Sequence, residues 1–158
     1  MKVLFTGSFD PVTTGHLSLI TRAASLFDEV VCTVFNNAEK THFFSAEKRL
    51  MLLSASVAHL PNVTCDLSSG YVADYVKKNG INAIIRGIRN GNDLAYEREM
   101  AEYNMRHSGV ETILLPAESG MEEVSSSLLR RLIREGKSTD GLLPDAAKAL
   151  LSDCKIGK

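Results

Sequence analysis

The chain has 158 residues, of which 44% are hydrophobic and 23% are charged, and its formal net charge at pH 7 is -1. This length and composition are typical of one globular domain, so we expect a single domain over residues 1–158. The charge balance has no basic excess, which argues against nucleic acid as a partner and requires any anion site to be local.

The cysteines and the apolar runs indicate the compartment. The three cysteines are odd in number and lack CxxC spacing, so neither a disulfide framework nor a zinc site is indicated. The opening segment MKVLFTG has too few apolar residues for a signal peptide, and no run approaches the ~20 apolar residues of a membrane span. We therefore expect a cytoplasmic protein that makes no membrane contact.

Short β-branched or apolar runs recur along the chain with amphipathic stretches between them. They predict five strands, at residues 3–5, 30–35, 63–65, 83–85 and 112–115. The stretch between the first two, HLSLITRAASLF, has apolar residues at i, i+3, i+4 and i+7, which places them on one helical face: Ile20, Ala23, Ala24 and Phe27.

Further helices are predicted between the later strands. One begins after Ser45, which can cap it, and another covers about residues 71–78 and stops at Asn79-Gly80. Others cover about residues 91–107, 125–135 and a short stretch after Pro144. Parallel strands need long, right-handed and usually helical crossovers. The predicted fold class is therefore α/β, a doubly wound, Rossmann-like five-stranded parallel sheet with helices on both faces.

Polar segments follow four of the predicted strands. They read GSFDPVTTGH, NNAEKTHFF, RGIRNGND and PAESGMEEVSSS. The first three supply Lys, Arg or His, and the last supplies hydroxyls and the start of a helix. In open α/β sheets ligands bind outside the carboxyl ends of the strands, so these segments predict an anion site there.

Several of these residues have both a functional and a structural interpretation. His16 opens a helix, where it could donate a hydrogen bond to a phosphoryl oxygen or be an ordinary first-turn residue. Asp10 could be a metal ligand, but Asp before Pro is favoured as a turn former. Lys40 could bind a phosphate or be a solvated surface charge. Arg86 follows a buried strand, where an unpaired charge is costly, so a bound anion is an attractive partner.

Three motifs together resemble one known family. Residues 13–16, TTGH, match the TxGH form of the nucleotidyltransferase superfamily motif. Residues 85–89 with Asp93, Tyr96 and Glu97, and residues 124–127 with Arg130, are similar to motifs of the bacterial phosphopantetheine adenylyltransferase family. The three motifs have that family's order and spacing, and the resemblance covers essentially the whole chain.

The resemblance implies a role for individual residues. His16, Lys40 and Arg89 would be catalytic, with His16 stabilising the transition state and Lys40 orienting the acceptor phosphate. The acceptor would be bound by Ser8, Lys40, Val72 and Arg86. ATP would be bound by Ser8, Phe9, His16, Gly87, Ile88, Arg89, Glu97, Met121, Glu122, Glu123, Val124, Ser125, Ser126 and Ser127. Two departures from the family pattern are Ser8, where a threonine is usual, and the two acids Glu122 and Glu123, where aromatic residues are common.

The resemblance also implies a reaction. ATP would transfer its adenylyl group to 4'-phosphopantetheine, giving dephospho-coenzyme A and pyrophosphate, by direct in-line attack of the acceptor phosphate. No general base is needed because a phosphate monoester, with a second pKa of about 6, is already ionised. Mg²⁺ would bind through ATP phosphates and water, with no dedicated metal site on the protein. A homo-oligomer, a hexamer by resemblance, is expected.

Three alternatives remain open from sequence alone. The chain could be an adenylyltransferase or cytidylyltransferase of the same fold that uses another phosphorylated acceptor, such as nicotinate mononucleotide. It could be a non-catalytic nucleotide-binding regulator, although such a protein should have lost His16, Lys40 or Arg89, and all three are present. It could also be a structural subunit, since assembly and catalysis can coexist.

Overall fold

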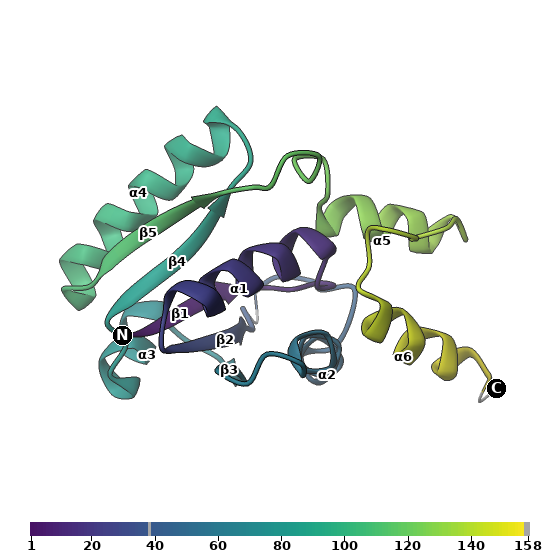
Figure 1. The fold of residues 1–158 in the computed structure, drawn as a ribbon, viewed down its shortest axis with the longest axis horizontal. Coiled ribbons are helices and arrows are strands. Elements are labelled where there is room, and N and C mark those ends of the chain that lie inside the picture. Colours follow the sequence, from purple (N-terminus) through teal and green to yellow (C-terminus); the bar gives the residue numbers. More distant parts are fainter. Residues whose placement is uncertain (38, 157–158) are drawn as a thin grey trace.

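The computed structural model describes residues 1–37 and 39–156 and contains a five-stranded sheet with helices on both faces (Figure 1). The strands are β1 (Lys2–Gly7), β2 (Glu29–Phe35), β3 (Val63–Ser68), β4 (Ala83–Ile88) and β5 (Glu111–Pro116). The helices are α1 (Thr14–Leu26), α2 (Ala46–Val57), α3 (Val72–Asn79), α4 (Gly91–Ser108), α5 (Ser126–Arg134) and α6 (Asp145–Ile156). The predicted α/β fold is confirmed.

All four strand pairings are parallel, in the order β3-β2-β1-β4-β5. The chain moves outward from β1 through β2 to β3, then crosses back to β4 on the other side of β1. The two crossovers that leave β1 and β4 therefore diverge. Such a switch point opens a crevice at the carboxyl ends of the central strands, which is where ligands bind in folds of this kind.

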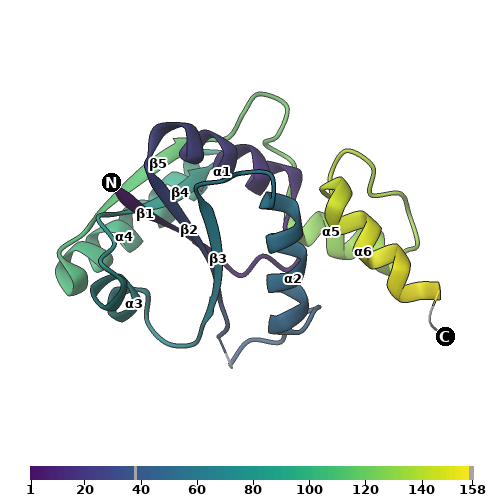
Figure 2. The ribbon, with the colours of Figure 1, turned by 60° about the horizontal axis from the view of Figure 1, so that its bottom comes forward.

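The strand side chains alternate between two apolar layers because successive residues of a strand point to opposite faces. Val3 and Phe5 of β1 belong to the larger layer, which contains buried residues of α1, α2, α5 and α6. Leu4 and Ile84 belong to the smaller layer with Val76 of α3. Figure 2 shows α3 and α4 on one side of the sheet, α2 on the other, and α5 and α6 beyond the edge of the sheet.

The predicted helix ends are confirmed where the capping groups can be seen. Ser45 Oγ accepts the Lys48 N–H at 3.2 Å at the start of α2. Gly80 ends α3 with φ of 62°, a left-handed conformation that glycine adopts without steric cost. One difference affects the site: β4 continues to Ile88, beyond the predicted end at residue 85, because Arg86 and Gly87 pair with β5. Arg86 is thus held on a strand.

Within residues 1–37 and 39–156, no helix combines the length and the apolar character that crossing a membrane requires.

Candidate active site

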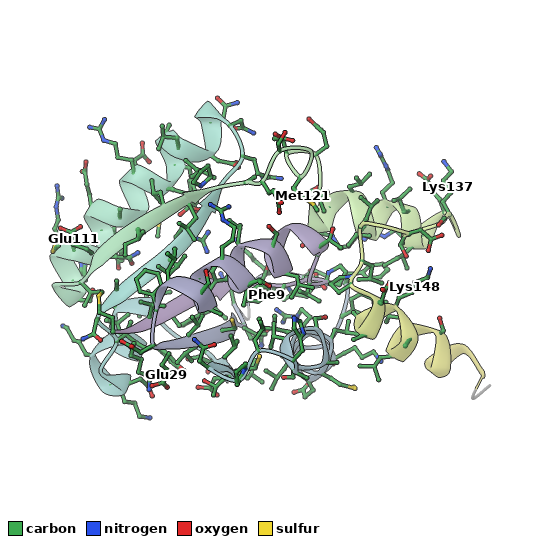
Figure 3. All side chains as sticks on the ribbon, in the orientation of Figure 1. Phe9, Glu29, Glu111, Met121, Lys137 and Lys148 are labelled. Atoms are coloured by element: carbon green, nitrogen blue, oxygen red, sulfur yellow. The ribbon has the colours of Figure 1, made fainter. Side chains whose placement is uncertain are left out.

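A cleft of about 380 Å³ lies at the carboxyl ends of β1 and β4, between the start of α1 and the start of α5. Figure 3 places Phe9 beside α1 and Met121 on the loop that joins β5 to α5. Twelve of the predicted site residues line this cleft: Ser8, Phe9, His16, Arg86, Gly87, Arg89, Glu97, Met121, Val124, Ser125, Ser126 and Ser127. The fold thus brings the three sequence motifs together.

The remaining predicted residues lie elsewhere. Lys40 lines a second recess of about 440 Å³, which adjoins the cleft at Ser8. Val72 packs against the smaller apolar layer, and Ile88 lies at the end of β4 outside the cleft lining. Glu122 and Glu123 are exposed on the loop before α5, where a Glu122 carboxylate oxygen accepts the Gly120 N–H at 2.8 Å.

His16 is fixed by a reciprocal cap at the start of α1. Its own N–H donates to Thr13 Oγ1 at 3.1 Å, and the Thr13 N–H donates to His16 Nδ1 at 3.1 Å. The imidazole also stands edge-on to the buried Phe9 ring, with centroids 5.1 Å apart. Because Nδ1 accepts a hydrogen bond, a neutral ring carries its proton on Nε2. The sequence showed the motif but not this tautomer.

The charge state of His16 follows from its surroundings. Burial lowers the pKa of its imidazole to about 4, and the positive charges of Arg86 and Arg89 lower it further in the same direction. The ring is therefore neutral near pH 7 when no anion is bound. A neutral imidazole can still donate the Nε2–H hydrogen bond to a phosphoryl oxygen, and it does not first have to give up a proton.

Arg86 is paired with a carboxylate, so the expectation that only a bound anion would neutralise it is wrong. Its Nε and Nη2 donate to the two Glu97 oxygens at 2.8 and 2.7 Å, and its Nη1 donates to the Thr6 carbonyl. Glu97 is only 5% exposed. The pairing arises because α4 runs back alongside β4, which brings Glu97 over a residue eleven positions earlier.

Arg89 is held in a similar but more exposed way. Its Nε and Nη2 donate to the Asp93 carboxylate at 2.9 and 3.3 Å, and its backbone N–H donates to the same group at 3.1 Å. The hydrogen bond from Arg89 lowers the pKa of Asp93. The Arg89 side chain is 39% exposed, so this guanidinium can exchange its partner more easily than Arg86 can.

The three serines join the start of α5 to the loop after β1. Ser125 Oγ caps the helix by accepting the Leu128 N–H at 3.2 Å, and Ser126 Oγ donates to the Pro11 carbonyl at 2.8 Å. Ser127 Oγ accepts from Arg130 at 3.0 Å. The helix cap and the phosphate interpretation are compatible, since a helix start that faces a cleft attracts anions through its N–H groups and its dipole.

Asp10 has a structural role, as the sequence favoured. Its carboxylate is buried and accepts the N–H groups of Phe43 and Phe44 at 2.7 and 2.9 Å. Asp93 and Glu97, the carboxylates that line the cleft, are bound to arginines. In the described part of the chain no three His, Cys, Asp or Glu side chains gather as a metal site. These residues fit a metal that is held mainly by ligand oxygens and water.

Comparison with known proteins identifies the family. A cytidylyltransferase-like family model matches residues 4–132. A phosphopantetheine adenylyltransferase of Cutibacterium acnes is 41% identical over 153 residues, which cover 97% of this chain and 98% of the relative. One of Deinococcus radiodurans is 39% identical over 153 residues, covering 96% and 92%. The chain belongs to the phosphopantetheine adenylyltransferase family.

One residue that supports the adenylyltransferase site was missed from sequence. Arg49 on α2 is fully buried, and its guanidinium donates to the Phe44 carbonyl at 3.2 Å, to the Ser8 carbonyl at 2.9 Å and to Asn36 Oδ1 at 2.5 Å. Burial lowers its pKa, and the Asp10 charge opposes that shift. Arg49 therefore ties together the segments that follow β1 and β2.

A periodic signal could have found Arg49. The buried residues of α2 fall at i, i+3, i+4, i+7 and i+8: Arg49, Leu52, Leu53, Ser56 and Val57. An arginine in line with an apolar helix face indicates a charge that the fold must satisfy internally.

We expect the His16 imidazole to titrate near pH 4 in the ligand-free enzyme, because burial and two arginines disfavour its cation. The ring should stay neutral from pH 7 down to about pH 5, and ATP should raise its pKa by adding negative charge. Proton NMR of the imidazole measures this, with His16→Gln to assign the signal. Titration near 6.5, the usual value for histidine, would contradict the burial argument.

Arg49→Met should lower the free energy of unfolding by about 3 kcal/mol or more, since it leaves three buried acceptors without their donor. Arg131→Met, on the exposed face of α5, is the matched control and should change it by less than about 0.5 kcal/mol. Urea unfolding measures both. Equal, small effects would mean that the Arg49 hydrogen bonds contribute little net stability.

Proposed function

We propose that the protein transfers the adenylyl group of ATP to the phosphate of 4'-phosphopantetheine, forming dephospho-coenzyme A and pyrophosphate in coenzyme A biosynthesis. The observation that carries this proposal is one cleft where a neutral His16, two arginines and the start of α5 converge. These are groups that hold phosphates and stabilise charge on them. Membership of the family supplies the choice of acceptor.

Positioning and charge stabilisation are the catalytic work in this proposal. The acceptor phosphate is ionised near neutral pH, so it attacks the α-phosphorus in line without a general base. His16 Nε2–H donates to an α-phosphoryl oxygen as negative charge builds there. Ser8 and Arg86 hold the acceptor phosphate, and Lys40 reaches it from the neighbouring recess. The Thr13 cap and the Phe9 ring keep the imidazole oriented throughout.

The two carboxylates beside the arginines orient them before substrate arrives. The bonds made by Arg86 to Glu97 and Thr6 use three of the five N–H donors of a guanidinium, so two are available to the cleft. Because both ends of the Glu97 pair are anchored on α4 and β4, Arg86 does not have to reorganise during the reaction. Asp93 performs the same service for Arg89 at the more exposed side.

Mg²⁺, oligomeric state and compartment complete the proposal. Mg²⁺ enters bound to ATP, where it would neutralise phosphate charge and keep several waters. Leu94, Tyr96 and Tyr103 of α4 are exposed by 45, 59 and 42%, and such an apolar surface suits contact between copies of the chain. A homohexamer in the cytoplasm is proposed by resemblance to the family, with no nucleic acid or membrane as partner.

We expect His16→Ala to lower kcat by about 10²–10³-fold while ATP affinity changes little, because the hydrogen bond strengthens mainly in the transition state. Single-turnover kinetics and equilibrium ATP binding measure the two effects separately. Losses of equal size in turnover and in ATP binding would assign His16 to ground-state binding instead.

The acceptor is tested by pyrophosphate release with ATP and Mg²⁺. We expect release with 4'-phosphopantetheine and none with unphosphorylated pantetheine, since the attacking group is the phosphate. Release with nicotinate mononucleotide alone would keep the chemistry and change the substrate. No release with any acceptor would overturn the proposed function and favour a regulatory nucleotide-binding role.

A further inference from the structure

The second recess has a different character from the cleft. It lies between the segment after β2 and the outer side of α5, and it holds about 440 Å³, within the range of small-molecule sites. Its lining is Ser8, Asp10, Lys40, Thr41, His42, Phe43, Arg130 and Arg134. Ser8 and Arg130 also line the cleft, so the two spaces adjoin. We call this second space the basic recess.

The positive charges of the basic recess have neutral partners in the structure. Arg130 donates to the Asp10 carbonyl at 2.8 Å and to Ser127 Oγ at 3.0 Å. The Arg134 guanidinium lies 5.1 Å from the Phe43 ring centroid, a cation–π contact. The Asp10 carboxylate is already engaged by the backbone, as described above. These contacts hold the two cations in place and leave their charge uncompensated.

The cost of this arrangement points to an anion. Arg130 and Arg134 are four residues apart on α5, where like charges repel, and Lys40 faces the same space. A bound phosphoryl group would remove that repulsion and accept hydrogen bonds from all three side chains. The His42 Nε2 atom is also buried without a hydrogen-bond partner among the described residues.

The position of the basic recess favours one end of the reaction over the other. The acceptor side is marked by Val72, which packs in the apolar layer of α3 and the side of the sheet that α4 covers. The basic recess is bounded by α5, whose Leu129 packs in the opposite layer, with α1 and α2. In an in-line displacement the leaving group departs on the side away from the attacking group.

We propose that the basic recess binds the β- and γ-phosphates of ATP and holds them as pyrophosphate when they leave. This rests on the proposed function. The acceptor phosphate oxygen forms a bond to the α-phosphorus while the bond from that phosphorus to the bridging oxygen of the β-phosphate breaks. The electron pair leaves with pyrophosphate, and the developing charge falls on Lys40, Arg130 and Arg134. Arg134 is then a binding residue for the leaving group.

The test uses the full-length enzyme in the reverse direction, making ATP from dephospho-coenzyme A and pyrophosphate. Arg134→Gln should raise the KM for pyrophosphate about tenfold, since a charged hydrogen bond to phosphate is lost, and should leave the KM for dephospho-coenzyme A unchanged. In the forward direction the KM for ATP should rise and that for 4'-phosphopantetheine should not. Arg134→Lys should retain most of the affinity.

Arg131→Gln is the matched control, because Arg131 is the exposed neighbour on α5 that does not line the basic recess. Its KM values should match those of the unaltered enzyme. A rise in the KM for 4'-phosphopantetheine with Arg134→Gln, or no change in any KM, would overturn the proposal. Calorimetric titration with pyrophosphate alone gives a reading that needs no turnover. Weaker binding by Arg134→Gln would support the basic recess even if the acceptor proves to be different.

Discussion

β1 is hydrogen-bonded to β2 on one side and to β4 on the other, and all three strands point the same way. Their carboxyl ends must therefore meet at one edge, while the crossovers that follow them turn to opposite sides of the sheet. That constraint opens the cleft and decides which residues face it. The loop after β1 delivers Ser8 and His16, and β4 delivers Arg86 and Gly87. The remaining contacts only refine positions that the topology has already assigned.

The electrostatics of the cleft work by holding charge in place ahead of the ligand. Arg86 and Arg89 are each gripped by a carboxylate, and together they keep His16 neutral. An incoming triphosphate thus meets oriented guanidinium groups and an imidazole donor without waiting for a proton to move. Preorganised donors of this kind lower a barrier because they do not have to reorient when charge develops. The buried Arg49 extends the same principle to the backbone around Ser8.

Much of the fold was predictable because its signals are local. The five apolar runs, the Ser45 cap and the Asn79-Gly80 stop are read from neighbouring residues, and the TxGH motif marks the start of α1. The pairing of Arg86 with Glu97 was not predictable in the same way, since it depends on how α4 returns over β4. The tautomer of His16 likewise depends on one backbone hydrogen bond from Thr13.

The bond from Ser126 Oγ to the Pro11 carbonyl joins residues 115 positions apart and fastens the last wall of the cleft to the first. Synthesis proceeds from the N-terminus, so β1, β2 and β3 can pair while α5 is still unmade. The phosphate-attracting start of α5 then docks late, onto a loop formed early. A nascent chain that lacks α5 presents His16 and the arginines to open solvent, and nucleotide can be enclosed only once nearly the whole sequence has emerged from the ribosome.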